Sequence, residues 1–254
     1  MSVDIVNGRL LLGASSPVES NTLAALSKAL SVPIQVTVEP SDPDLHCTLS
    51  RDHCNAPMKA GNKIRRGTST SSNICTMGFH IRVGGDEQFL TAGHCGFQPG
   101  FDEWYHQGYS GIFAAGVALK VPLAYRQSGF DFMRLQMPDT EVSDDIFDSS
   151  QNITGSAYPI VGQIICASMA MSNQVDCGSV TVANTTWTSQ GCACLVSGGG
   201  YTGIAAIVGD SGSPIYALGG GSSEPATAIG MVNTLTHFAR VKDALSFYGA
   251  TLVT

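Results

Sequence analysis

Short β-prone runs separated by turn residues dominate this sequence and restrict what it can fold into. Runs rich in valine, isoleucine, threonine and tyrosine are interrupted by glycine, serine, asparagine and proline, and 29 of the 254 residues are glycine. Such a pattern favours antiparallel β-structure over helices. A chain of this length can bury a substantial core as one large all-β domain, or as a domain with a small appendage.

One turn segment contains a candidate nucleophile. The stretch IVGDSGSPIY places Ser211 between two glycines and directly after Asp210. A serine hydroxyl is a weak nucleophile on its own, because it needs a base, a group that orients the base, and donors for the developing oxyanion. GDSG alone is also compatible with an ordinary glycine-rich turn. The case for catalysis therefore depends on partners elsewhere in the chain.

Two upstream segments supply candidate partners. In FLTAGHCG, His94 follows an apolar β-prone run, which suits an imidazole held at the end of a strand. In SGFDFMRLQM, Asp131 precedes residues that alternate with a period of two, which predicts a strand. Asp102 also lies between His94 and Ser211, but QPGFDEWYHQG reads as a surface loop, so we rank it second. The order His, Asp, Ser differs from that of subtilisins and α/β-hydrolases.

The motifs TAGHC and GDSGSP, with DF between them and DALSFYG near the end, resemble the chymotrypsin-fold serine proteases, most closely the short bacterial streptogrisin and α-lytic type. The resemblance covers roughly residues 46–254. It implies an all-β fold of two antiparallel Greek-key barrels, about 68–137 and about 155–239, with the active site between them. The helical spacing of apolar residues in RVKDALSFYG, followed by Gly249, predicts a terminal helix over about 240–249.

The resemblance also implies a role for each candidate residue. Ser211 attacks a peptide or ester carbonyl, and His94 takes the serine proton and returns it to the leaving group. Asp131 orients the His94 ring and stabilises the imidazolium. The backbone N–H groups of Gly209 and Ser211 form the oxyanion hole. No cofactor and no metal ion is expected.

Three departures from the family bear on substrate binding. Ser213 stands where most relatives have a second glycine, which is tolerated if its φ angle is negative. The segment before Ser211 lacks the cysteine that streptogrisin relatives usually have. The segment after Val232 is short, which affects the edge strand to which a substrate backbone normally adds. The predicted pocket residues are Ala205, Ala206, Ile207, Met231, Val232 and Asn233; none is a carboxylate, so we expect a preference for small or medium apolar side chains.

Eight cysteines without a regular metal-binding spacing favour disulfides in an exported protein. By resemblance to the family we expect bridges Cys75–Cys95, Cys166–Cys177 and Cys47–Cys54. Cys192 and Cys194 would point to the same face of an extended strand, too far apart for a relaxed bridge, and their pairing stays open. The start MSVDIVNGRL lacks an export signal, so we expect such a signal upstream of this sequence.

Residues 1–45 form a separate small segment in this interpretation. VDIVNGRLLLGAS and PIQVTVEP predict strands, and SNTLAALSKAL predicts a short helix between them. The segment resembles the tail of a propeptide, and a plain N-terminal extension is the alternative. If the protein is made as a zymogen, we expect the maturing cut in EPSDPDLH or near NKIRRGTSTSSN.

Charge and composition narrow the partners. The net charge of −7 and the scattered Lys and Arg residues argue against nucleic acid as a partner. No apolar run reaches the ~20 residues that a membrane helix needs, and we expect a secreted monomer that acts on polypeptides. The remaining histidines, His46, His53, His80, His106 and His237, are interpreted as structural or surface residues. A solvated loop explains Asp144, Asp145 and Asp148 better than a calcium site does.

Two classes of function remain open. The first is a secreted serine endopeptidase made as a zymogen, with a serine esterase as a variant of the same chemistry. The second is a chymotrypsin-fold binding or regulatory module, or a blocked precursor, in which the shortened edge leaves little peptidase activity. The retention of Ser, His and Asp together favours the enzyme, whereas the shortened segment favours the module.

Overall fold

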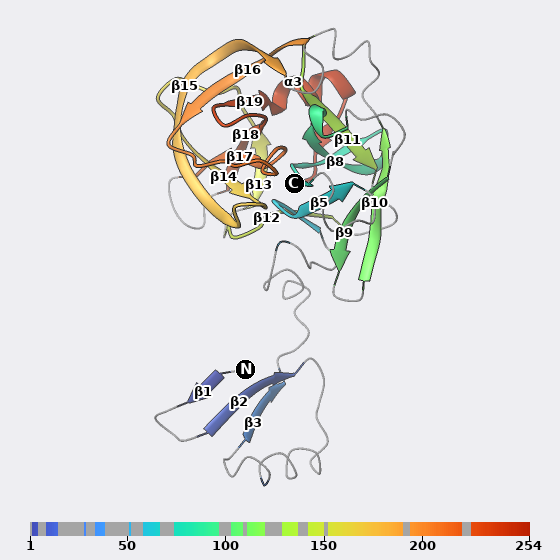
Figure 1. Ribbon diagram of the computed structural model, residues 1–254, viewed down its shortest axis with the longest axis vertical. Helices are drawn as coiled ribbons and strands as arrows, with labels where there is room; N and C mark the ends of the chain where they lie inside the picture. The colour runs from blue at the N-terminus through green and yellow to red at the C-terminus, as the bar shows by residue number, and fades with distance from the viewer. Residues whose placement is uncertain are drawn as a thin grey trace. The chain divides into compact units, whose positions relative to one another are not determined.

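The structure is a computed structural model that describes residues 2–4, 9–14, 28, 34–38, 51, 58–66, 74–96, 103–108, 111–119, 129–136, 142–149, 152–189, 194–219 and 225–254. The chain divides into two compact units, Met1–His46 and Cys47–Thr254. The described elements are almost all strands, as predicted, with one short α-helix near the C-terminus (Figure 1). None of the described helices is long and apolar enough to cross a membrane.

The first unit contains a small sheet. Its strands β1 (Ser2–Asp4), β2 (Arg9–Ala14) and β3 (Ile34–Val38) lie in the order β1-β2-β3. β1 and β2 pair antiparallel, whereas β2 and β3 pair parallel. A parallel pair requires a crossover connection. The helix predicted in that connection lies outside the described residues, except for Lys28, which is helical.

The second unit begins with an eight-stranded sheet. Its order is β20 (Thr251–Leu252), β7 (His80–Val83), β8 (Asp86–Ala92), β11 (Phe132–Gln136), β10 (Gly111–Leu119), β9 (Glu103–Gly108), β5 (Lys63–Arg66) and β6 (Ile74–Thr76). β4 (Met58–Ala60) and β12 (Val142–Ile146) form a separate parallel pair. The pairing of β20 with β7 brings the C-terminal strand back to the first half of the unit, which the sequence did not predict.

The second half forms a seven-stranded sheet. Its order is β13 (Ile153–Ser156), β18 (Ala226–Val232), β17 (Pro214–Ala217), β14 (Ile164–Met169), β15 (Gln174–Ser189), β16 (Cys194–Thr202) and β19 (His237–Arg240). β19 pairs with both β16 and β18, so the pairings from β18 to β19 close into a ring. β15 is the longest strand, and with β16 it curves around the outside of this half (Figure 1).

The terminal helix α3 spans Val241–Tyr248 and agrees with the prediction to within a residue at each end. Val241 and Ala244 are its buried residues, as expected from the helical spacing of its apolar positions. Gly249 ends the helix in the left-handed conformation, with φ of 59°, and donates its N–H to the last turn. A glycine takes this conformation without the steric cost that a side chain imposes.

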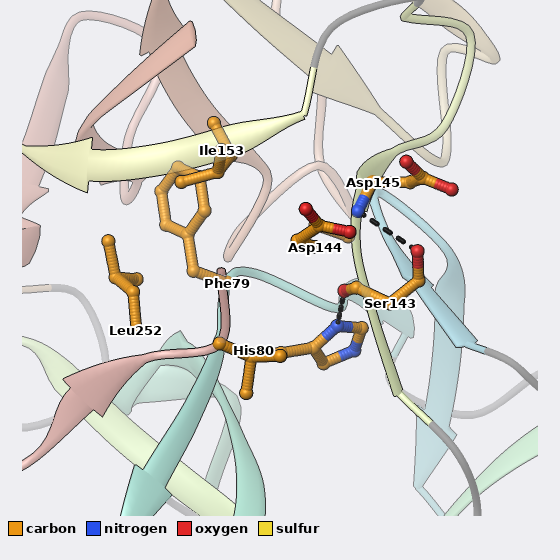
Figure 2. Close-up of a pocket in the computed structure, with 9 residues that line it drawn as sticks. Phe79, His80, Ser143, Asp144, Asp145, Ile153 and Leu252 are labelled. Atoms are coloured by element: carbon orange, nitrogen blue, oxygen red, sulfur yellow. Dashed lines mark hydrogen bonds between the residues drawn. The ribbon is translucent and has the colours of Figure 1, made fainter. Parts of the chain in front are cut away.

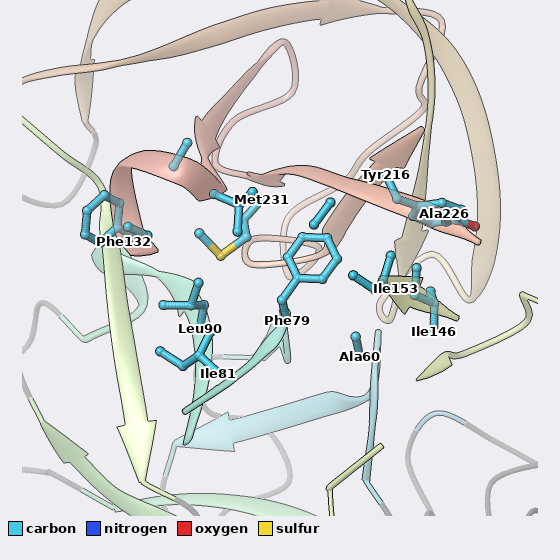
Figure 3. Packing of buried hydrophobic residues seen from close by; sticks show 14 of the residues in the cluster. Ala60, Phe79, Ile81, Leu90, Phe132, Ile146, Ile153, Tyr216, Ala226 and Met231 are labelled. Carbon is cyan, nitrogen blue, oxygen red and sulfur yellow. The ribbon is translucent and has the colours of Figure 1, made fainter. Parts of the chain in front are cut away.

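Both halves of the second unit share one apolar core. Phe79 and Leu90 come from the first half, Met231 from β18, and Val241 and Ala244 from α3, and all belong to one cluster of buried residues. Figure 3 shows the Phe79 ring lying close to Met231 and Ile153, at the junction of the two sheets. Fully burying a side chain of this kind stabilises the fold by roughly 1.5–3 kcal/mol. The two halves are therefore not independent folding units.

Two of the predicted disulfides are present. Cys75 bonds Cys95, with Cα atoms 6.4 Å apart, and ties β6 to the histidine segment. Cys166 bonds Cys177 across the antiparallel pair β14 and β15, where the two residues face each other in register. The predicted Cys47–Cys54 bridge and the pairing of Cys192 lie outside the described residues.

Candidate active site

Two glycines shape the loop that presents Ser211 just before β17. Gly209 has φ of 102° and Gly212 has φ of 92°. A Cβ atom on Gly212 would overlap the Thr91 hydroxyl and the Thr76 carbonyl oxygen, so only glycine fits there. Ser213 is not among the residues with positive φ, which meets the condition under which a serine is tolerated at this position.

The Asp210 carboxylate, directly before Ser211, stabilises the same loop through hydrogen bonds. Its side chain is fully buried and accepts backbone N–H groups from Met171 at 2.7 Å and Ser172 at 3.1 Å on one oxygen. Its other oxygen accepts the Ile207 N–H at 2.9 Å. Backbone N–H groups of this kind are the ordinary way to satisfy a buried carboxylate without a cation. Asp210 therefore joins the loop to the β14–β15 turn and holds the backbone next to Ser211 in place.

The first half of the unit also holds the loop that contains Ser211. The Thr76 backbone N–H donates to the Ser211 carbonyl at 2.8 Å, and the Thr76 hydroxyl donates to the Gly209 carbonyl at 3.1 Å. From the other side, the Gly212 N–H donates to the Val232 carbonyl at 2.7 Å. The carbonyl groups of Gly209 and Ser211 thus point into the protein. In the described part of the chain, neither of their N–H groups donates to a backbone carbonyl.

His94, Asp131 and Ser211 lie together in one hydrogen-bonded series. The Ser211 hydroxyl donates to His94 Nε2 at 2.8 Å, and His94 Nδ1–H donates to Asp131 Oδ2 at 3.0 Å. The His94 backbone N–H also donates to Asp131 Oδ1, at 2.6 Å. His94 belongs to the short 3-10 helix η2 (Gly93–Gly96) after β8, and Asp131 directly precedes β11, which pairs with β8. The strand pairing therefore brings the histidine and the aspartate together.

The environment of Asp131 keeps it ionised. Burial by itself favours the neutral acid, but the adjacent His94 ring and its hydrogen bond, with donors from Asn233 and Ser189, lower the pKa of Asp131 below its ordinary value. The side chain is 3% exposed, whereas that of His94 is 21% exposed. A buried carboxylate behind a partly open imidazole is the arrangement that orients a general base toward a hydroxyl.

Comparison with known proteins agrees with this geometry. No family model matches the sequence. Streptogrisin-A of Streptomyces griseus is 27% identical over 97% of this chain and 75% of its own length. Streptogrisin-D of the same organism is 30% identical over 76% of this chain, but the match spans only 48% of that protein. A glutamic acid-specific serine protease of known structure is 26% identical, with a TM-score of 0.58 over 77% of this chain and all of its own.

This chain is a chymotrypsin-fold relative of the streptogrisins and the α-lytic protease homologues. The relationship is distant but extends over most of the chain, and it agrees with the mostly β architecture and the short terminal helix of the described residues. Within this chymotrypsin-like fold, the histidine and aspartate come from the eight-stranded sheet and the serine from the loop before β17 of the seven-stranded sheet.

The six residues predicted to line a substrate pocket fall into two groups. Ala205 and Ile207 are exposed, whereas the other four are buried: Ala206, Met231, Val232 and Asn233. The Asn233 side chain donates to the Asp131 backbone carbonyl at 2.6 Å and accepts the Ala239 N–H at 2.6 Å. The N–H groups of Val232 and Asn233 are also engaged within the protein, with the Ser213 and His237 carbonyls, each at 3.0 Å.

Two residues near the triad carry no local sequence signal and were not predicted. Ser189, at the end of β15, donates its hydroxyl to Asp131 Oδ2 at 3.0 Å. Thr76, described above, holds the loop of Ser211. Both lie in ordinary β-prone runs, and only the folded arrangement of strands brings them to the site.

The remaining candidates lie apart from this site or outside the described residues. Asp102, His46 and His53 are among the latter. His80 is buried beside a small cavity, where its Nδ1–H donates to the Ser143 carbonyl at 2.6 Å (Figure 2). Burial lowers the pKa of His80 to about 4, so the ring is neutral at physiological pH. Within the described residues, no group of three or more His, Cys, Asp or Glu side chains is arranged to hold a metal ion.

Proposed function

We propose that this chain is a serine endopeptidase that hydrolyses peptide bonds through an acyl-enzyme. The observation that carries the proposal is the series from Asp131 through His94 to the Ser211 hydroxyl, at 3.0 and 2.8 Å. His94 Nε2 accepts the proton as Ser211 attacks the carbonyl carbon and later gives it to the leaving amine. Asp131 stays ionised and stabilises the imidazolium. Water then hydrolyses the acyl-enzyme by the same route in reverse.

The N–H groups of Gly209 and Ser211 are the proposed oxyanion donors. The positive φ of Gly209, 102°, and the two hydrogen bonds that hold the Gly209 and Ser211 carbonyls against Thr76 support this role. A Cβ atom on Gly209 would lie 2.9 Å from Met171 Cγ, so the position also needs glycine for space. Losing one such donor typically costs about 3 kcal/mol of transition-state stabilisation.

The packing near the predicted pocket supports a preference for small or medium apolar side chains. Ala206 and Val232 belong to the same buried apolar cluster as Phe238 and Tyr201. Phe238 is fully buried, and its ring lies so close to Gly199 that a Cβ atom there would overlap it. We therefore expect a pocket bordered by these side chains to be apolar. An apolar lining of this kind does not favour a charged substrate side chain.

Two observations argue against a charged preference. Asp176 is the carboxylate beside Ala205, and both of its oxygens already accept backbone N–H groups, from Ala205 at 2.8 Å and Cys177 at 2.9 Å. The glutamic acid-specific relative uses a histidine triad in substrate binding. In this sequence, His237 is the only histidine after His106, so three histidines cannot be assembled from the second half.

We also propose that the protein is secreted and made as a zymogen, with residues 1–45 as the tail of a propeptide. Disulfides at Cys75–Cys95 and Cys166–Cys177 fit an oxidising compartment. Of the two candidate cleavage regions, the contacts of Arg51 favour EPSDPDLH.

Arg51 is an integral part of the second unit. It is 1% exposed, and it donates to the Gly61 carbonyl at 3.0 Å, the Ser168 hydroxyl at 2.7 Å and Asp148 at 3.0 Å. β5 follows within the eight-stranded sheet, between β6 and β9. A cut near NKIRRGTSTSSN would separate Arg51 and β5 from the rest of the unit. A cut before Arg51 leaves these contacts intact.

Labelling with a fluorophosphonate probe, followed by intact mass, tests the proposal directly. The full chain, the chain nicked before Arg51, and the variants Ser211→Ala and His94→Ala are compared. We expect one adduct on the wild type and none on either variant, because the probe needs an activated serine and an oxyanion hole. Labelling only after nicking would identify residues 1–45 as an inhibitory segment.

A binding or regulatory module is the second candidate, and the buried Phe238 is the observation that favours it. A peptide library digested by the labelled form separates the two. Cleavage after small or medium apolar residues supports the endopeptidase. Probe labelling without peptide cleavage would leave a competent triad behind a closed pocket, and no labelling in either form would refute the enzyme.

A further inference from the structure

The Asp131 carboxylate has a third donor besides the two from His94. The Ser189 hydroxyl lies 3.0 Å from Asp131 Oδ2, the same oxygen that accepts His94 Nδ1–H. Ser189 is 1% exposed and ends β15, a strand of the seven-stranded sheet. A carboxylate is only an acceptor, so the hydroxyl must be the donor in this contact.

Other contacts hold the backbone on either side of the Asp131 carboxylate. The Ser197 N–H donates to the Gly129 carbonyl at 2.6 Å. Asn233, which directly follows β18, donates to the Asp131 carbonyl. Asn233 also helps to lower the pKa of Asp131, but the Ser189 hydroxyl is the donor that lies directly on the oxygen facing His94 Nδ1.

We propose that Ser189 is a positioning residue that keeps the Asp131 carboxylate aligned with His94 Nδ1. This inference rests on the proposed function, because it concerns the same triad. Two donors on Oδ2 and one on Oδ1 fix the rotation of the carboxylate about its Cβ–Cγ bond. They also offset the burial that favours the neutral acid. Without the Ser189 hydroxyl, the only remaining donor to Oδ2 is His94 Nδ1–H, which belongs to the ring that transfers the proton.

A purely structural role for Ser189, as the end of a buried strand, is the competing explanation. The variants Ser189→Thr and Ser189→Val separate the two, because their side chains have nearly the same shape and only threonine keeps a hydroxyl. Both β-branched residues suit a strand. Any cost of the added methyl group at this buried position is common to both. Ser189→Ala, which removes the hydroxyl without adding volume, covers the case in which neither larger side chain folds.

The kinetic prediction compares the matched pair on a short peptide ester. We expect Ser189→Val to lower kcat about tenfold to a hundredfold relative to Ser189→Thr, with KM changed less than about threefold, given the usual strength of hydrogen bonds to charged groups. Thermal unfolding of both variants serves as the control for folding. Equal kcat values for the two folded variants would overturn the inference. If neither folds, a wild-type kcat for Ser189→Ala would do the same.

A second readout does not depend on activity. The proton shared by His94 Nδ1 and Asp131 gives a low-field NMR signal that can be assigned by its loss in His94→Ala. We expect Ser189→Thr to keep the wild-type chemical shift and Ser189→Val, or Ser189→Ala, to move it. If the wild type proves inactive, the proposed function fails, but this comparison still decides whether Ser189 positions Asp131. An unchanged signal without the hydroxyl refutes the positioning role.

Discussion

The buried histidine of β7 predicts a loss of stability in mild acid that is separate from catalysis. Burial lowers the pKa of His80 to about 4 from an ordinary value of 6.5, against the opposing effects of the Ser143 carbonyl, Glu87, Asp144 and Asp145. In the unfolded chain, the His80 ring is therefore protonated as the pH falls through 6.5. In the folded chain, it is protonated only near pH 4. The stabilising contribution is complete above pH 6.5 and is lost as the pH falls toward 4. At 1.36 kcal/mol per pH unit, the loss amounts to about 3 kcal/mol.

The variant His80→Gln tests this magnitude. A glutamine cannot titrate, and it keeps a donor for the Ser143 carbonyl. Urea unfolding at pH 7.5, 6.5, 5.5, 4.5 and 4.0, with both proteins in a Ser211→Ala background to prevent autolysis, gives the free energy of unfolding. We expect the advantage of histidine over glutamine to shrink steadily below pH 6.5, by about 3 kcal/mol at pH 4. A difference that stays constant across this range would refute the assignment of His80 as a buried neutral group.

Four further substitutions, one of them a control, test the loop of Ser211 and the predicted pocket by thermal unfolding or substrate profiling. Gly212→Ala should destabilise by about 3 kcal/mol or more, because its Cβ overlaps Thr76, whereas Gly84→Ala, with φ of 62° and open space around it, should cost only about 1 kcal/mol. Ser213→Ala should leave stability unchanged or raise it by about 1 kcal/mol, since the buried Ser213 hydroxyl has no hydrogen-bond partner among the described residues. Phe238→Val should shift peptide-library cleavage toward larger apolar side chains; an unchanged profile would place the pocket elsewhere.

The parts of the site that could be predicted are those with a local signal. His94 and Ser211 stand in motifs whose small residues reflect tight backbone geometry, as the φ of Gly212 shows. Asp131 could be selected over Asp102 because a strand with period two follows it, and the structure places that strand beside β8. The terminal helix could be predicted because its apolar residues recur with a helical period and Gly249 follows its last turn.

The rest of the site has no local signal. Ser189 lies 58 residues from Asp131 in the sequence, and Thr76 lies 133 residues from Gly209. Serine and threonine are common in strands, so their presence in a β-prone run says nothing about the partner they will meet. Asn233 was expected at the pocket edge, but the structure turns its side chain toward backbone groups of Asp131 and Ala239. Contacts of this kind depend on the final arrangement of strands.

The contacts around the triad are reciprocal between the two halves of the second unit. Asp131 directly precedes β11 of the eight-stranded sheet, yet its carboxylate and carbonyl are held by Ser189 and Asn233 of the second half. Ser211 belongs to the second half, yet its carbonyl is held by Thr76 of the first. Each half therefore positions a residue that the other half supplies, and the shared apolar core keeps the two together. A change that loosens this core should disturb both ends of the triad at once, before either sheet unfolds.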